Sequence, residues 1–280
     1  MSKKKICIIV CLAILVIVAL GAVKYFYNGN DLVVLMYHNI IPESEIIENN
    51  EDRGYSISLE EFEKQLKYLK ENNYENVDYE KFICWKKGKC KIDKKSVMIT
   101  IDDGLTSSLN YAKDVLEKYG YTSIVFVIGD RILEEENLSG IKGRNFLNIN
   151  QIKNNNVIFF GSHSYGLHKF DESGTPYALV LKYEELENDI IQNKKIINTN
   201  FYSYPFGTFN KGLVKTLKKH GYEYAFRTGE KKTYKYENNY MIHRISATRD
   251  FNDFKSIFET NKYSQKFIDR LKNIYFYFKY

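Results

Sequence analysis

Short apolar runs alternate with amphipathic segments along most of the chain. Runs with the length and composition of buried strands lie at residues 32–36, 97–101, 122–128, 157–161, 201–204 and 223–227. Segments with helical spacing of apolar side chains lie between them, at residues 59–71, 109–119, 182–197 and 211–220. Ser58 and Glu61 form a capping-box pattern at the start of the first helix, and Gly120 ends the second. No repeat or low-complexity linker divides residues 31–280, so the alternation predicts one α/β domain with a parallel sheet, open or closed into a barrel.

A longer apolar segment lies near the N-terminus. Residues 6–23 carry no charge and follow three lysines, and as a helix they would rise about 27 Å, close to the ~30 Å hydrocarbon core of a bilayer. We therefore expect residues 1–30 to be cytoplasmic lysines and a single transmembrane helix, with residues 31–280 outside the cell. A secretory signal with a small-residue cleavage site at residues 19–21 is the alternative, and it would make the domain a secreted one.

The net charge argues against a nucleic-acid partner. Lys and Arg number 41 and Asp and Glu 35, a formal charge of +6. The first 24 residues hold four lysines and no acidic residue, so 6 − 4 leaves only +2 for the remainder. That remainder shows no basic stripe, and we expect no nucleic-acid binding.

The four cysteines fall into two pairs. Cys7 and Cys11 lie inside the apolar N-terminal run, where they are expected to act as small hydrophobic residues. Cys84 and Cys90 would lie in an oxidising compartment, and the short, glycine-containing segment between them allows a local disulfide.

Reactive side chains follow the predicted strands. Three of the five histidines, His38, His163 and His168, and the adjacent carboxylates Asp102 and Asp103 come directly after apolar runs. Because the carboxyl ends of parallel strands meet at one rim, these groups are expected to converge.

Two histidines and one carboxylate match the ligands of catalytic zinc, which leaves a coordination position for water. Adjacent aspartates point in different directions, so one can bind a metal while the other faces a substrate. His163 and His168 can converge only if residues 164–167 turn, which a Tyr-Gly pair at 165–166 allows. Taken alone, Asp-Gly at 103–104 is also a common turn and helix-start pattern.

These motifs resemble those of a known family. Thr-Ile-Asp-Asp-Gly at residues 100–104 resembles the first motif of the NodB-type polysaccharide deacetylases (carbohydrate esterase family four), and residues 162–168 resemble the second. The histidine spacing, one residue longer than in most members, is similar to that of the branch that deacetylates poly-β-1,6-N-acetylglucosamine in biofilm matrices. Met-Tyr-His at 36–38 and Tyr-Pro-Phe-Gly at 204–207 strengthen this likeness. The resemblance covers about residues 32–245 and implies an irregular (β/α) barrel.

The resemblance also implies roles for individual residues. Asp103, His163 and His168 would hold a divalent metal, zinc in the first instance, with Co²⁺ or Ni²⁺ as alternatives. Asp102 would be the general base that takes a proton from the metal-bound water attacking the acetamide carbonyl. The segment Tyr204, Pro205 and Phe206 would lie at the substrate, with the Phe206 N–H as an oxyanion donor.

Two histidines compete for the general acid that an amine leaving group requires. His38 occupies the Met-Tyr-His motif, and His243 follows a Tyr-Met-Ile segment that partly resembles the Leu-x-x-His motif of other members. We favour His38. Ser203 stands where most members have an arginine, and no Asp-x-x-Asp-Trp motif is found. The motifs therefore leave the orientation of Asp102 unexplained, with Arg244 or Arg249 as candidate substitutes for that arginine.

The sequence therefore predicts a metal-dependent N-deacetylase of cell-surface polysaccharide containing N-acetylglucosamine, with poly-β-1,6-N-acetylglucosamine as the first choice. Peptidoglycan or chitooligosaccharides are alternative substrates, and an inactive glycan-binding protein on the same scaffold is an alternative function. The expected partners are the acetylated amino-sugar polymer, the membrane through the N-terminal helix, and surface polysaccharide export machinery.

Overall fold

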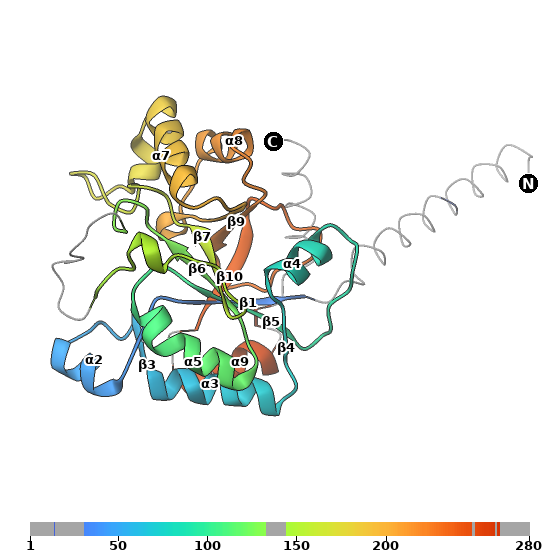
Figure 1. Cartoon of the computed structure of the whole chain (residues 1–280). Coiled ribbons are helices and arrows are strands. Elements are labelled where there is room, and N and C mark those ends of the chain that lie inside the picture. The colour runs from blue at the N-terminus through green and yellow to red at the C-terminus, as the bar shows by residue number, and fades with distance from the viewer. Residues whose placement is uncertain (1–13, 15–30, 133–143, 248–249, 261, 264–280) are drawn as a thin grey trace, which may run out of the picture.

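The computed structural model describes residues 14, 31–132, 144–247, 250–260 and 262–263, and every structural statement below concerns these residues. Its main sheet is parallel throughout and closes on itself (Figure 1). The strand order is β1-β10-β9-β8-β7-β6-β5, and β1 also pairs with β5, so seven strands form a barrel with β4 attached at its outside. The barrel strands and β4 are β1 (Val33–Tyr37), β4 (Glu75–Asn76), β5 (Ser96–Ile101), β6 (Ser123–Val127), β7 (Ile158–Ser162), β8 (Phe201–Ser203), β9 (Tyr224–Thr228) and β10 (Ile242–Ser246). The predicted α/β barrel is thus confirmed.

Helices surround the barrel. Two of them, α7 and α8, pack side by side on one flank, and α3, α5 and α9 cover another (Figure 1). The α-helices are α2 (Glu43–Asn49), α3 (Leu59–Glu71), α4 (Tyr79–Lys86), α5 (Lys113–Tyr119), α6 (Tyr177–Val180), α7 (Tyr183–Ile196), α8 (Lys211–Lys219) and α9 (Phe251–Glu259). Shorter elements are a separate parallel pair, β2 (Asn39–Ile41) with β3 (Ser56–Ser58), the π-helical turn η1 (Ser108–Ala112), and the 3₁₀ turns η2 (Ile149–Gln151) and η3 (Pro205–Gly207).

Local signals account for the predicted helix ends. Ser58 caps α3, because its hydroxyl accepts a hydrogen bond from Glu61 N at 3.2 Å. Gly120 ends α5 in the left-handed conformation, with φ of 76°. The predicted helix 109–119 is only partly α-helical, since its first turn is the π-helical segment η1.

Each barrel strand presents alternate side chains to the interior and to the helices. Interior apolar residues form one cluster, which includes Val34, Met98, Ile124, Phe126, Phe226 and Ile242. Apolar residues at the alternate, outward positions, including Leu35, Ile99, Val125 and Ile245, belong to a second cluster, packed with α3, α5 and α9. Toward the carboxyl ends of the strands the interior becomes polar, because Thr100, Asp102, Ser203 and Arg244 occupy it. This change from apolar to polar layers places the reactive groups at one end of the barrel.

The membrane anchor predicted for residues 1–30 lies outside the described residues, apart from Ile14. Within the described part of the chain, no helix has the length and apolar character needed to cross a bilayer. The structure joins Cys84, in α4, to Cys90 by a disulfide with a Cα–Cα distance of 5.5 Å.

Candidate active site

Asp103, His163 and His168 converge at the carboxyl-end rim of the barrel. The Asp103 Oδ1 atom lies 3.5 Å from Nε2 of His163 and 3.4 Å from Nε2 of His168, and the candidate ligand atoms of all three lie within 4.8 Å of one another. Two tetrahedral ligands at bond lengths of about 2.1 Å would be about 3.4 Å apart. Asp103 Oδ1 is buried and has no hydrogen-bond partner in the described chain. The three residues therefore fit a divalent metal ion, as the sequence predicted.

The hydrogen bond on the far side of the His163 ring fixes its tautomer. Nδ1 lies 2.8 Å from the carbonyl oxygen of Ser203, which can only accept, so Nδ1 carries the proton and Nε2 keeps its lone pair. Burial lowers the pKa of His163 to about 4, with the carboxylate of Asp102 acting in the opposite direction. The ring is consequently neutral near pH 7, with its free nitrogen directed at Asp103.

The loop between the two histidines turns as expected, and a residue of α7 holds it. Asp189 accepts hydrogen bonds from Tyr165 N at 3.0 Å and from Gly166 N at 2.6 Å. Ser164 lies in the left-handed region with φ of 69°, which reverses the chain between His163 and His168. Burial raises the pKa of Asp189 to about 6, against the opposing effect of the two N–H donors. Asp189 was not predicted from the sequence, because its position on a helix far along the chain carries no motif.

A second residue missed by the sequence analysis holds the other oxygen of Asp103. The hydroxyl of Tyr55, in the segment between α2 and β3, donates to Asp103 Oδ2. Burial raises the pKa of Tyr55 well above its usual value, so this hydroxyl keeps its proton. The Arg144 guanidinium lies 4.0 Å from the centre of the Tyr55 ring and donates from Nε to the buried carboxylate of Glu51 at 2.9 Å. Tyr55 thus orients a ligand without using the oxygen that faces the histidines.

Arg244 holds Asp102. Its two terminal nitrogens donate to Oδ1 and Oδ2 of Asp102, both at 2.7 Å, and Nη2 also donates to the Ser203 hydroxyl at 2.8 Å. That hydroxyl lies 3.2 Å from Asp102 Oδ2. Burial by itself would raise the pKa of Asp102, but the charge and hydrogen bonds of Arg244 outweigh burial and hold it well below its usual range. Arg244 therefore supplies the guanidinium that the sequence lacks at position 203, whereas Arg249 lies outside the described residues.

The two candidate acids lie on different sides of the barrel wall. His38 directly follows β1, and its positive charge would lower the pKa of both Asp102 and Asp103. Its Nδ1 is buried without a hydrogen-bond partner in the described chain, and its ring centre is 5.0 Å from that of Tyr55. His243 precedes the inward-facing Arg244 on β10, so it faces outward, where its Nδ1 pairs with Glu237. The structure thus brings His38, and not His243, to the aspartate pair.

The turn after β8 lies beside the metal triad. Phe206 has φ of 56°, and its ring centre is 4.4 Å from that of His168. The hydrogen bonds of this turn run from Gly207 N to Tyr204 O at 2.8 Å and from Thr208 N to Pro205 O at 3.1 Å, and neither uses the Phe206 N–H. The Tyr204 side chain points away, because its hydroxyl donates to Tyr240 O at 3.0 Å and its ring belongs to the cluster under α7 and α8. Of the predicted trio, Phe206 contacts a histidine of the triad, whereas the Tyr204 ring points away from it.

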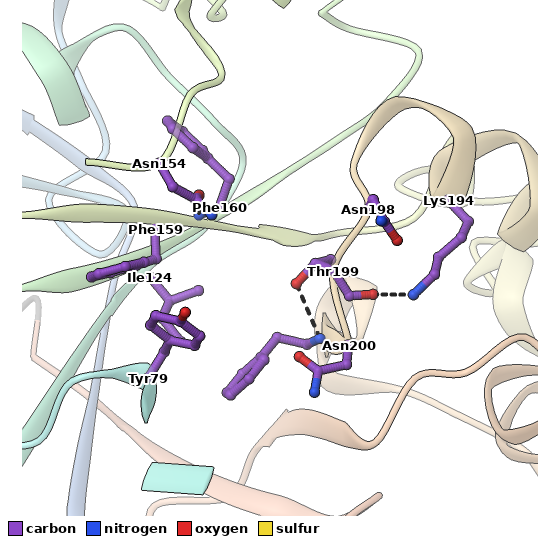
Figure 2. A pocket seen from close by; sticks show the side chains of 10 residues that line it. Tyr79, Ile124, Asn154, Phe159, Phe160, Lys194, Asn198, Thr199 and Asn200 are labelled. Atoms are coloured by element: carbon purple, nitrogen blue, oxygen red, sulfur yellow. Dashed lines mark hydrogen bonds between the residues drawn. The ribbon is translucent and has the colours of Figure 1, made fainter. Parts of the chain in front are cut away.

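A separate cavity of about 330 Å³ lies near the opposite end of the barrel, where β6, β7 and β8 begin (Figure 2). Its lining includes Tyr79, Phe159 and Phe201, together with the Lys194 ammonium, which donates to Thr199 O. Among the described residues that line it there is no carboxylate or imidazole. The carboxylate and imidazole groups of the candidate site thus lie at the rim that holds the aspartate pair and not in this cavity.

Comparisons with known proteins agree with this site. A family profile described as Polysaccharide deacetylase matches residues 89–225, which include both aspartates, both histidines of the triad and the Pro205 turn. The chain belongs to the polysaccharide deacetylase family, and it is accordingly a hydrolase of carbon–nitrogen bonds.

Relatives with more specific names cover most of the chain. The poly-β-1,6-N-acetyl-D-glucosamine N-deacetylase of Staphylococcus aureus strain MSSA476 is 26% identical over 241 residues, 81% of this chain and 82% of that protein. The enzyme of the same name from Staphylococcus epidermidis is 27% identical over 240 residues, with the same shares of the two chains.

Solved structures share the fold. The de-N-acetylase from Aggregatibacter actinomycetemcomitans superimposes with a TM-score of 0.69 at 19% identity, over 81% of this chain and 99% of that one. IcaB from Ammonifex degensii does so with a TM-score of 0.66 at 23% identity, over 82% and 96%.

Proposed function

We propose that the protein removes acetyl groups from N-acetylglucosamine units of a cell-surface polysaccharide, and that this polymer is poly-β-1,6-N-acetylglucosamine. The observation that carries the reaction is the ionised Asp102, held by Arg244 beside the metal-ligand set of Asp103, His163 and His168. The choice of polymer is supported by the names of the two staphylococcal relatives, which cover four fifths of this chain.

Different residues around the triad contribute to different steps of amide hydrolysis. A divalent cation held by Asp103, His163 and His168 would polarise the acetamide carbonyl and activate a water. Asp102 accepts the proton of that water, since its lowered pKa keeps it ionised at neutral pH. The Phe206 N–H, which the turn leaves unused, donates to the carbonyl oxygen as negative charge develops there. Arg244 and Ser203 keep the Asp102 carboxylate in position while the proton moves.

His38 is the proposed general acid. The departing amine must receive a proton, and an imidazole can deliver one at neutral pH. The proposal is supported by the position of His38 at the end of β1, by its electrostatic effect on both aspartates, and by its unpartnered Nδ1. His243 lacks this support because it pairs with Glu237 on the outer side of β10.

Acetate release by the full chain tests the proposal. Oligomers of β-1,6-linked N-acetylglucosamine should release acetate, chitooligosaccharides and peptidoglycan should release much less, and Asp103→Ala or His163→Ala should abolish release. Arg227→Met, a substitution on the outward face of β9, serves as the matched control. Faster acetate release from chitooligosaccharides or peptidoglycan would show that one of these, and not poly-β-1,6-N-acetylglucosamine, is the preferred substrate. If the wild-type protein binds glycan but releases acetate from no substrate, the protein is a glycan-binding protein and not an enzyme.

We also propose that this reaction takes place outside the cell, next to the membrane. The support is the uncharged run at residues 6–23 behind three lysines, and the disulfide between Cys84 and Cys90 suits an oxidising compartment. External protease added to intact cells should degrade the domain. Full protection of the domain in intact cells would contradict this location, as would recovery of the whole chain in the cytoplasmic fraction.

A further inference from the structure

We propose that Phe170 and Phe206 form a sugar-binding subsite next to the metal triad, on which the apolar face of a neighbouring pyranose unit stacks. The inference rests on the proposed function, since it assumes that a glycan chain crosses this rim. It adds where the polysaccharide is held, at a sugar unit next to the one that loses its acetyl group.

A row of rings leads from the metal ligand to the solvent. The ring centres of His168 and Phe206 are 4.4 Å apart, and those of Phe206 and Phe170 are 4.2 Å apart, with interplanar angles of 41° and 30°. Phe170 is 51% exposed at the outer end of this row, and at the inner end the His168 ring centre lies 5.0 Å from that of the buried His163. The exposed ring is thus continuous with the site of reaction.

The backbone around Phe170 is held in place by a small network of hydrogen bonds. Phe170 forms an antiparallel bridge with Pro176, and Asp171 N donates to Thr175 O at 2.9 Å. The Asp171 carboxylate accepts from Ser173 N at 2.9 Å and from Thr175 N at 2.8 Å. Because these contacts order the turn, Phe170 is presented to solvent by a defined loop rather than by an unpaired chain segment.

An exposed aromatic ring in this position fits one class of ligand. A large apolar side chain held in water is unfavourable, and such side chains mark binding sites when they adjoin a functional centre. Pyranose rings carry C–H groups on one face and are uncharged in an acetylated amino-sugar polymer, so a flat aromatic surface suits them better than an ion pair would. Polar groups that fix the orientation of the ligand are already supplied by the adjacent site.

The test compares Phe170→Ala with Phe170→Tyr and with Ile149→Ala in the full chain. Ile149 is 46% exposed on the separate turn η2 and takes no part in the row of rings, so its substitution removes a similar apolar surface without changing that row. For β-1,6-linked oligomers, Phe170→Ala should raise KM about three- to tenfold with kcat unchanged, the size typical of an aromatic contact. Phe170→Tyr should restore the wild-type KM, and Ile149→Ala should not alter it. A single N-acetylglucosamine unit should show no difference among the variants.

A binding measurement separates this subsite from the reaction itself. The Asp102→Asn protein should bind the oligomers without turnover. Adding Phe170→Ala to it should weaken this binding by about three- to tenfold, the same factor as the expected change in KM. Equal affinities with and without Phe170→Ala, or an unchanged KM, would overturn the subsite. An effect of Phe170→Ala on binding to anionic lipid vesicles but not to glycan would also overturn it, in favour of a membrane contact. Failure of wild type to release acetate would overturn the proposed function alone, because binding still decides the subsite.

Discussion

Replacing Arg244 by methionine should raise the pKa of Asp102 and move the acidic limb of the pH–activity profile to higher pH. Methionine has a similar length but carries no charge. In the wild type, two hydrogen bonds of 2.7 Å join the guanidinium to both oxygens of Asp102, and the two side chains are only 1% and 3% exposed. Without Arg244, burial dominates and disfavours the ionised carboxylate.

The magnitude follows from the charge separation. At an effective dielectric constant of about 20, unit charges about 4 Å apart interact by about 4 kcal/mol, which corresponds to about three pKa units at about 1.36 kcal/mol each. Opposite charges at such distances lower the pKa of carboxyls by about one to three units in proteins. Because Asp102 must be ionised to accept a proton, the acidic limb should rise by about one to three units.

The free energy of unfolding should change with pH in a matching way. The lowered pKa of Asp102 stabilises the wild type above the ordinary value of 3.8, and this contribution is lost as pH falls through the folded-state pKa. In Arg244→Met the folded-state pKa returns toward the ordinary value, so the variant lacks this stabilisation at neutral pH. The deficit at pH 7 should reach about 3–5 kcal/mol, the cost of leaving one partner of a buried ion pair uncompensated.

Acetate release measured from about pH 4 to 9 gives the kinetic profile, and urea unfolding gives the stability. Arg227→Met, on the outward face of the adjacent strand, is the matched control and should leave the acidic limb in place. The double variant Asp102→Asn with Arg244→Met should regain stability relative to Arg244→Met alone, because no buried charge remains unpaired. An acidic limb unchanged in a folded Arg244→Met protein would refute the assignment of Arg244 as the group that sets the pKa of Asp102.

Three further results are expected. Removing bound metal with a chelator should abolish acetate release and one equivalent of Zn²⁺ should restore it; activity that persists in protein shown to be free of metal would contradict the ligand assignment. Asp189→Asn should weaken Zn²⁺ binding about 10- to 100-fold in a competition titration, since an amide nitrogen cannot accept a hydrogen bond from Gly166 N. Glu187, on the same helix, pairs with Lys219, so Glu187→Gln is the control and should not weaken Zn²⁺ binding. Equal Zn²⁺ affinities of the two variants would contradict the role of Asp189 in holding the loop between the histidines. His38→Gln should lower kcat about 10²- to 10⁴-fold, while His243→Gln should leave kcat close to the wild-type value. The reverse ranking would make His243 the acid.

Much of the fold was predictable from local pattern. Runs of buried-type residues and capping signals predicted the alternation of strands and helices, and the parallel arrangement then required their carboxyl ends to share a rim. The strand β10 was missed because Arg244 interrupts its apolar pattern, and that residue faces a polar layer inside the barrel rather than solvent. The pattern of apolar residues along a segment predicts whether the strand as a whole is buried. It does not predict which polar groups a single inward-facing residue contacts.

By itself, the sequence predicted the α/β class and the candidate ligand set of Asp103, His163 and His168, because strand ends and motif spacing are properties of short segments. The sequence left Arg244 and Arg249 open as the group that orients Asp102 and gave no sign of Tyr55, and the tertiary structure decided both contacts. Tyr55 and Arg244 come from segments far from the motifs, and barrel closure brings them to Asp103 and Asp102. The same closure separated His38 from His243, because alternate residues of a strand face opposite sides of the barrel wall and only the register shows which side is inside.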